Sequence, residues 1–446
     1  MGNETSKPGT LSAPFHPRLI RALNGTEEYV TQPRHSGHPA HTIVSVAHLT
    51  GPVSTITRSH LATALFQSAK KYLYLRALVH FDPRKGQSFF HEATSEELPS
   101  LIDAAIEFGA ENGLDYDKWK SIIAKELENY VPDLNGTTLP WKVCFMRSSD
   151  GSKAALVHVV DHLVEDGRAN QIFFTDLLTN LSKAVANEPF HDPKPFPFDE
   201  ALSSQLRREG SISYLQGIQE FGKLMYRNSY VHDCPPNTPS VPIDSRTYSI
   251  HFLTLSKEET SKAISSAKSH SVTVTSMLAG VALKAIKEAF ESAESESYYV
   301  VVVGIDLRSH YKPIAGKDSP QEGELALFKE LFGSHIDVRM DAYGVKAEGT
   351  VWDVVQPFDA DSKYYVDSKR ISRDGLHLES YIPQVCDIAT NAKNGRYAMM
   401  HYSNRGTWQV LSRFLIQPPL PHGLLSHRWA KTLGHSKSAN SILPLP

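Results

Sequence analysis

The chain has 446 residues, of which 41% are hydrophobic and 21% charged, with 26 Gly and 27 Pro. This composition is typical of a globular protein and excludes fibrous and wholly disordered classes. The formal net charge of −3 provides no basic field for a phosphate backbone, so we expect small-molecule substrates and no nucleic acid.

The cysteines and the N-terminus indicate where the protein works. Three cysteines that lie far apart (Cys144, Cys234 and Cys386) make neither a disulfide framework nor a zinc spacing, which favours a reducing compartment. No stretch resembles a signal peptide or a transmembrane segment, so we expect a cytoplasmic protein. The start Met-Gly-Asn-Glu-Thr-Ser fits the N-myristoylation pattern, with Gly2 as the lipidation candidate; the alternative is an ordinary disordered start. One myristoyl chain would give only weak peripheral membrane association.

Strand-like and helix-like stretches alternate along the first part of the chain. A strand is expected over Thr42 to Leu49, followed by a helix over Ser59 to Tyr74, where apolar residues recur at helical spacing. Trp141 to Arg147 and Ala155 to Val160 read as a β-hairpin. A further helix is expected to begin at Gly167.

Composition then divides the chain into three parts. Residues 1–187 form the expected N-terminal half, 188–245 a crossover with prolines clustered at both ends and one helix between them, and 246–446 the C-terminal half. Three prolines after Gln417 interrupt any helix or strand, so we expect order to fade beyond that residue.

The C-terminal half repeats the alternation of strands and helices. We expect a strand over Thr247 to Leu255, a helix from Ser256, an apolar helix over Ser276 to Ala289 and a strand over Tyr298 to Ile305. The sequence therefore predicts a mixed α/β fold built from two comparable halves.

The segment Val-His-Val-Val-Asp-His-Leu-Val-Glu-Asp-Gly, which ends at Gly167, carries the clearest chemical signal. A β-branched run leads to His162, and four residues later Asp166 and Gly167 turn the chain into a helix. A histidine at the mouth of a strand is well placed for a general base, because imidazole titrates near neutrality. Considered alone, the pattern H-x-x-x-D-G also fits a buried histidine that bonds its neighbours.

The order of hairpin, H-x-x-x-D-G and amphipathic helix resembles the superfamily of condensation domains and chloramphenicol acetyltransferases. Within it the chain is most similar to fungal and yeast alcohol acetyltransferases. Further landmarks follow in family order: Arg21 to Tyr29, Leu139-Pro-Trp141, Gly304-Ile-Asp-Leu-Arg308, and Tyr402-Ser-Asn-Arg-Gly406.

This resemblance implies a fold and a reaction. Two chloramphenicol-acetyltransferase-like halves, each of mixed β-sheet and helices, would enclose a central channel with His162 at its centre. His162 would act as general base while an acyl group, typically acetyl, passes from acyl-CoA to a hydroxyl or amine of a small molecule. The resemblance implies a ternary complex without an acyl-enzyme, acyl-CoA as co-substrate and no bound cofactor. We expect a monomer.

The resemblance also assigns supporting roles. Asp166 is expected to be a structural carboxylate that pairs with Arg308 through a bidentate contact and fixes the turn at Gly167. Ser403 or Asn404 would donate a hydrogen bond to the developing oxyanion.

Three features depart from the family pattern. Carrier-protein-dependent condensation domains have two adjacent histidines in this motif, and Asp161 stands in place of the first, which favours the CoA-dependent branch. As a buried acid, Asp161 is expected to pair with a basic residue. Glu165 and Arg168 read as solvated surface. The segment after Gly406 is short and rich in Pro, Ser and His, so the C-terminal half is a candidate for an incomplete one.

Other function classes have weaker support. Histidines 35, 38 and 41 have a metal-like spacing, but prolines place them in a loop and no further ligand completes the set, so no metal site is expected. The common hydrolase, nucleotide-binding and metalloprotease motifs are absent. Three hypotheses remain: a CoA-dependent O-acyltransferase of secondary metabolism, a carrier-protein-dependent condensation-type enzyme, and a non-catalytic binding or scaffold member of the fold.

Overall fold

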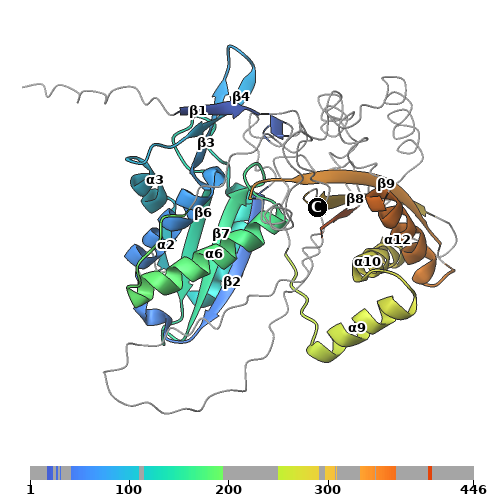
Figure 1. Ribbon diagram of the computed structural model, residues 1–446. Coiled ribbons are helices and arrows are strands. Elements are labelled where there is room, and N and C mark those ends of the chain that lie inside the picture. The colour runs from blue at the N-terminus through green and yellow to red at the C-terminus, as the bar shows by residue number, and fades with distance from the viewer. Residues whose placement is uncertain are drawn as a thin grey trace, which may run out of the picture.

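The computed structural model describes about half of the chain, and the elements below lie within that part. The described residues are 18–23, 27–28, 31, 42–109, 115–193, 250–290, 297–306, 308, 332–346, 348–367 and 400–403. They form a mixed α/β protein in which the elements β1 to α6 lie on one side and α9 to β10 on the other (Figure 1). The predicted fold class is confirmed.

A four-stranded sheet organises the N-terminal part. Its strand order is β2-β7-β6-β5, where β7 runs antiparallel to both neighbours and β5 runs parallel to β6. The bounds are Thr42–Thr50 for β2, Lys153–Asp161 for β7, Trp141–Arg147 for β6 and Ile106–Phe108 for β5.

Strand alternation gives this sheet two buried faces, because successive side chains point to opposite sides. Leu156 and Val160 of β7 share a core with α2 (Arg58–Lys71) and α6 (Gly167–Ala186). Val157 and its odd-numbered neighbours face α5 (Trp119–Asn129) on the other side. The strand that leads to the H-x-x-x-D-G motif is therefore covered on both faces, which fixes its end in space.

Smaller elements complete the N-terminal part. A second sheet has the order β1-β4-β3, with β1 at Arg18–Ala22, β4 at Gln87–Glu92 and β3 at Ala77–Asp82. The remaining helices are α3 (Leu98–Ala104) and the 3-10 turns Val53–Thr55, Leu73–Arg76 and Tyr116–Lys118.

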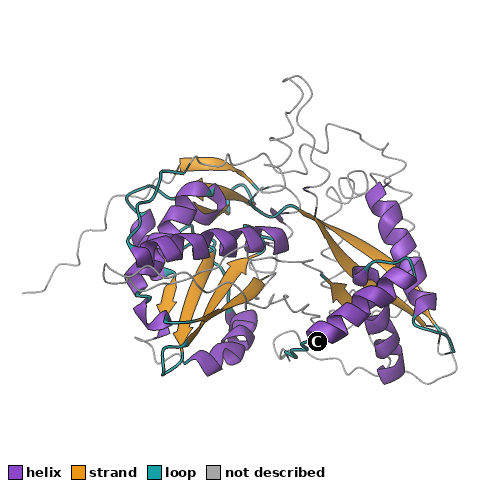
Figure 2. Cartoon of the chain, turned by 60° about the horizontal axis from the view of Figure 1, so that its bottom comes forward, coloured by secondary structure: helices purple, strands orange, loops and turns teal. Residues whose placement is uncertain are grey.

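The C-terminal part is a three-stranded sheet with helices on one side (Figure 2). β8 lies in the middle, parallel to β10 and antiparallel to β9. The helices α10 and α12 pack together where Gly280 meets Val355; a Cβ at Gly280 would lie 2.3 Å from the Val355 side chain, so only glycine permits this contact. The bounds are Lys257–Ser269 for α9, Val274–Phe290 for α10, Ser297–Asp306 for β8, Ile336–Val345 for β9, Trp352–Asp367 for α12 and Met400–Tyr402 for β10.

Hydroxyl side chains cap the helices α2 and α9. Thr57 accepts a hydrogen bond from the backbone N–H of His60 and starts α2, and Ser256 does the same for α9 with Glu259. Such caps satisfy backbone donors that have no partner within the helix. The helices expected from Ser256 and over Ser276 to Ala289 are confirmed.

One predicted strand is wrong in its described portion. Residues 250–255 form no ladder; instead Ile250 packs on the core beneath α5, and the ring of Phe252 lies 5.0 Å from that of Trp119 in an edge-on contact. Phe252 therefore lies against a helix, while Leu253 and Leu255 are exposed. The predicted crossover helix and the C-terminal tail lie outside the described residues. No helix in the described part is both long and apolar enough to cross a bilayer.

Candidate active site

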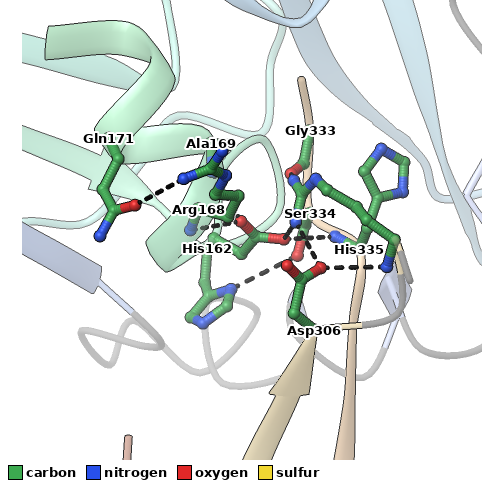
Figure 3. Close-up of polar contacts among 10 residues, drawn as sticks. His162, Arg168, Ala169, Gln171, Asp306, Gly333, Ser334 and His335 are labelled. Atoms are coloured by element: carbon green, nitrogen blue, oxygen red, sulfur yellow. Dashed lines mark hydrogen bonds and ion pairs between the residues drawn. The ribbon is translucent and has the colours of Figure 1, made fainter. Parts of the chain in front are cut away.

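His162 lies in the tight turn between β7 and α6, next to the C-terminal part of the chain (Figure 3). The turn is held by Asp161, the last residue of β7. Its carboxylate accepts a hydrogen bond from the backbone N–H of Leu163 at 2.7 Å, and its carbonyl accepts one from Val164 at 3.1 Å. The described hydrogen bond to the Asp161 carboxylate comes from a backbone N–H group, and its expected pairing with a basic residue stays a prediction. His162 itself remains partly exposed.

Asp166 is fully buried and caps α6. One carboxylate oxygen accepts hydrogen bonds from the backbone N–H groups of Arg168 and Ala169, at 2.9 and 2.8 Å. The other accepts from Nη1 of Arg308 at 2.8 Å and from the backbone N–H of His335 at 2.7 Å. Burial alone would raise the pKa of Asp166, but Arg308 and these donors outweigh burial and lower it.

Arg308 follows β8 and joins the two parts of the chain. Its Nη1 lies 2.8 Å from Asp166 and 2.9 Å from Asp306, while Nη2 donates to the carbonyl of Gly333 at 2.9 Å. The ion pair that the resemblance implied is present, but the bidentate geometry is wrong: a single guanidinium nitrogen bridges two carboxylates. The Nη2 atom holds the segment before β9 through the carbonyl of Gly333.

The segment from Phe332 to His335 inserts into the N-terminal part. Phe332 stacks on Tyr72 with ring centroids 4.5 Å apart and belongs to the core formed by α2 and α6. Gly333 has a φ of +131°, and a Cβ there would lie 2.7 Å from the Tyr74 ring, so this position requires glycine. No sequence feature pointed to this segment, since it carries no periodicity and no motif.

Ser334 reaches the candidate base from within this inserted segment. Its hydroxyl oxygen lies 3.4 Å from Nδ1 of His162 (Figure 3). The adjacent His335 is completely buried, and burial together with the nearby Arg308 lowers its pKa to about 4. His335 is therefore neutral at physiological pH and adds no charge next to His162.

A buried polar cluster lies behind the turn. Glu165 is fully buried, and its carboxylate accepts a hydrogen bond from Asn170 at 3.2 Å and lies 3.7 Å from Nδ1 of His158. The His158 ring stacks on Phe173 at 3.9 Å between centroids. The interpretation of Glu165 as solvated surface is wrong, because the turn folds this side chain inward beneath α6. Arg168, in contrast, is exposed as expected.

The remaining predicted site residues are Gly167, Ser403, Asn404 and Gly2. Gly167 is the first residue of α6. Ser403 is exposed directly after β10, and no hydrogen bond joins it to His162 within the described part of the chain. Asn404 and Gly2 lie outside the described residues. The described residues contain no group of three side chains suited to hold a metal ion.

Imidazole exchanges protons near neutral pH, which makes His162 the candidate for proton transfer at this site. His162 stands at a junction to which both parts of the chain contribute, and the backbone around it is held by Asp161 on one side and by Asp166 with Arg308 on the other. Rigid supports of this kind keep a base in one geometry while a substrate reacts.

A family model matches the part of the chain that contains this site. The family model of alcohol acetyltransferases matches residues 110–203, a segment that contains the whole H-x-x-x-D-G motif. No curated protein sequence matches the chain.

Solved structures show the same fold at low sequence identity. The polyketide synthase associated protein 5 from Mycobacterium tuberculosis has a TM-score of 0.61 at 13% identity over 89% of this chain and 84% of its own. The first condensation domain of the calcium-dependent antibiotic synthetase has a TM-score of 0.61 at 12% identity, covering 81% and 78%. A trichothecene 15-O-acetyltransferase from Fusarium sporotrichioides has a TM-score of 0.57 at 10% identity, covering 83% and 77%.

The match to the alcohol acetyltransferase model supports acyl transfer as the class of reaction, and the solved structures show the fold. Over residues 110–203 the chain is similar to the alcohol acetyltransferases, and its fold is similar to that of a condensation domain.

Proposed function

We propose that this protein transfers an acyl group, typically acetyl, from an acyl-CoA thioester to a hydroxyl group of a small molecule, with His162 as the general base. The observation that carries the proposal is the placement of His162: partly exposed, at the junction of the two parts, on a turn anchored by the buried Asp166–Arg308 ion pair. An amine acceptor would react by the same steps.

The reaction needs one group that takes and returns a proton. A nitrogen of His162 takes the hydroxyl proton of the acceptor while the oxygen attacks the thioester carbonyl. The tetrahedral intermediate then collapses, the carbon–sulfur bond breaks, and the imidazolium returns the proton to the departing thiolate. A positioned acid–base group contributes roughly 10²–10⁴-fold in rate.

Asp166 is proposed to support this reaction without touching the substrate. All four hydrogen bonds given for its carboxylate come from Arg308 and from backbone N–H groups, and the side chain is fully buried. A carboxylate in that position fixes the direction of the turn and cannot exchange protons with an acceptor molecule. Ser403 and Asn404 remain our proposed oxyanion donors.

The family match favours CoA as the acyl carrier. The matched model is that of alcohol acetyltransferases, and Asp161 replaces the first histidine that the family pattern of condensation domains would have. We further propose a monomer that works in the cytoplasm on a product of secondary metabolism.

Release of free thiol from acetyl-CoA tests the proposal. The full-length protein is incubated with acetyl-CoA and a panel of primary and secondary alcohols, and thiol is measured together with ester formation. We expect thiol release that depends on at least one alcohol and equals the ester formed. If turnover occurs only with an acyl carrier protein, that protein and not CoA is the acyl donor. If neither donor supports turnover, a binding or scaffold role is supported.

A further inference from the structure

We propose that Ser334 is a positioning residue for His162: its hydroxyl holds Nδ1 of the imidazole as the protonated nitrogen and leaves Nε2 as the base. The proposal deepens the proposed function and rests on it for the role of His162 in catalysis. The observation is the 3.4 Å contact between the Ser334 hydroxyl and Nδ1, made by residues 172 positions apart in the sequence.

The serine is held rigidly because both of its neighbours are anchored. The carbonyl of Gly333 accepts a hydrogen bond from Arg308 at 2.9 Å, and the backbone N–H of His335 donates to Asp166 at 2.7 Å. Phe332, one residue earlier, is buried in the N-terminal core. The Asp166–Arg308 ion pair that fixes the His162 turn therefore also fixes the backbone on both sides of Ser334. This one ion pair aligns the side chains of His162 and Ser334.

A hydroxyl acceptor at Nδ1 has two chemical consequences. A neutral imidazole carries one proton, so if Nδ1–H donates to Ser334, the lone pair of Nε2 is left to receive a substrate proton. When Nε2 takes that proton, Nδ1–H becomes a charge-assisted donor, and the hydrogen bond to Ser334 strengthens. The 3.4 Å separation is long for a hydrogen bond, which is common for catalytic contacts before the substrate binds.

Several charged groups of the described part of the chain lie near the His162 turn. Asp166 and its partner Arg308 lie at the start of α6 and after β8, and Asp306 accepts from Arg308 at the end of β8. His335 is neutral near pH 7, since its pKa is about 4, and Glu165 lies behind the turn beside His158. Removal of the uncharged Ser334 hydroxyl changes none of these charges.

The variant Ser334→Ala removes the acceptor and should destabilise the imidazolium form of His162. Because the hydrogen bond from the imidazolium to Ser334 is then lost, we expect the pKa of His162 to fall by about one pH unit and kcat to fall about ten-fold, with little change in KM. Ser334→Thr keeps a hydroxyl and should retain both values. Ser68→Ala is the matched control, since it removes a buried hydroxyl that binds Asp176 between α2 and α6, away from His162.

Two readouts keep this proposal separate from the proposed function. Diethyl pyrocarbonate modifies only the neutral form of an imidazole, so the rate at which the His162 peptide gains mass, measured against pH, reports the pKa of His162 without any catalysis. The acidic limb of kcat/KM against pH reports the same group during turnover. If the wild type shows no turnover but the modification profile shifts in Ser334→Ala, the proposed function fails and the positioning contact stands.

We expect the midpoint for modification of His162 to move to lower pH in Ser334→Ala, and to stay in place in Ser334→Thr and Ser68→Ala. An unchanged midpoint in Ser334→Ala would overturn the proposal. So would an acyl adduct on Ser334 after incubation with acetyl-CoA, because the serine would then be a nucleophile. If Ser334→Ala does not fold, Ser334→Cys is used, in which a weak sulfur acceptor replaces the oxygen and a smaller shift of the same sign is expected.

Discussion

Replacement of Asp166 by asparagine tests the ion pair that holds the two parts of the chain together. Each carboxylate oxygen of Asp166 faces two donors: Arg168 N–H and Ala169 N–H on one side, Arg308 Nη1 and His335 N–H on the other. An amide has only one oxygen, so in either orientation its NH2 group must face two donors. The variant also removes one of the two described carboxylates that compensate the charge of the buried Arg308 guanidinium.

The expected loss is large for a single isosteric substitution. Breaking a buried ion pair by removing one partner costs about 3–5 kcal/mol. At about 2–4 °C per kcal/mol for a domain of roughly 200 residues, the melting temperature of Asp166→Asn should fall by roughly 6–20 °C. The assay is thermal unfolding followed by circular dichroism at pH 7.

Asp306→Asn is the matched control. Asp306 contacts the same Nη1 of Arg308 at 2.9 Å, but its side chain is 48% exposed, so its loss should cost no more than about 1 kcal/mol. The pKa of Asp166 is lowered in the folded protein, so its contribution is present above the ordinary value of 3.8 and is lost as the pH falls further. The difference between wild type and Asp166→Asn should therefore shrink below about pH 4. Equal melting temperatures for Asp166→Asn and Asp306→Asn would refute this reasoning.

Two further predictions concern the inserted segment. The pKa of His335 is lowered from 6.5 to about 4, so the unfolded chain binds a proton before the folded protein does, and stability falls as the pH drops from 6.5 to 4. In the wild type this should lower the free energy of unfolding by about 2 kcal/mol between pH 7 and pH 5. His335→Asn should abolish that loss, as measured by urea unfolding at the two pH values. An identical pH dependence in both proteins would contradict the buried, neutral His335. Gly333→Ala places a Cβ within 2.7 Å of the Tyr74 ring at a φ of +131°, and it should lower the free energy of unfolding by about 1–3 kcal/mol in the same assay. Gly86→Ala is the control: Gly86 also has a positive φ but lies in open space, so this variant should lose less stability.

Local sequence signals were sufficient for the elements that carry the motif. The β-branched run before His162, the capping aspartate and the glycine that follows it predicted β7, the turn and α6, because each signal acts within a few residues. The hairpin of β6 and β7 was predicted from its alternation and its turn for the same reason.

Long-range contacts were beyond such signals. Arg308 was assigned only through the family resemblance, and its contacts with Asp166 and Gly333 join residues that are far apart in sequence. Ser334 was missed entirely. Glu165 was read as surface because charged residues in turns are commonly solvated, but here the turn directs it toward His158.

The central claim is that His162 is the base of an acyl transfer, and the rate of thiol release from acetyl-CoA with the best acceptor alcohol tests it most directly. The comparison is between wild type, His162→Ala and His80→Ala, in which the last removes an exposed histidine on β3. We predict that His162→Ala loses roughly 10²–10⁴-fold in kcat with an unchanged circular-dichroism spectrum, while His80→Ala keeps the wild-type rate. A folded His162→Ala protein that turns over at the wild-type rate would contradict the account.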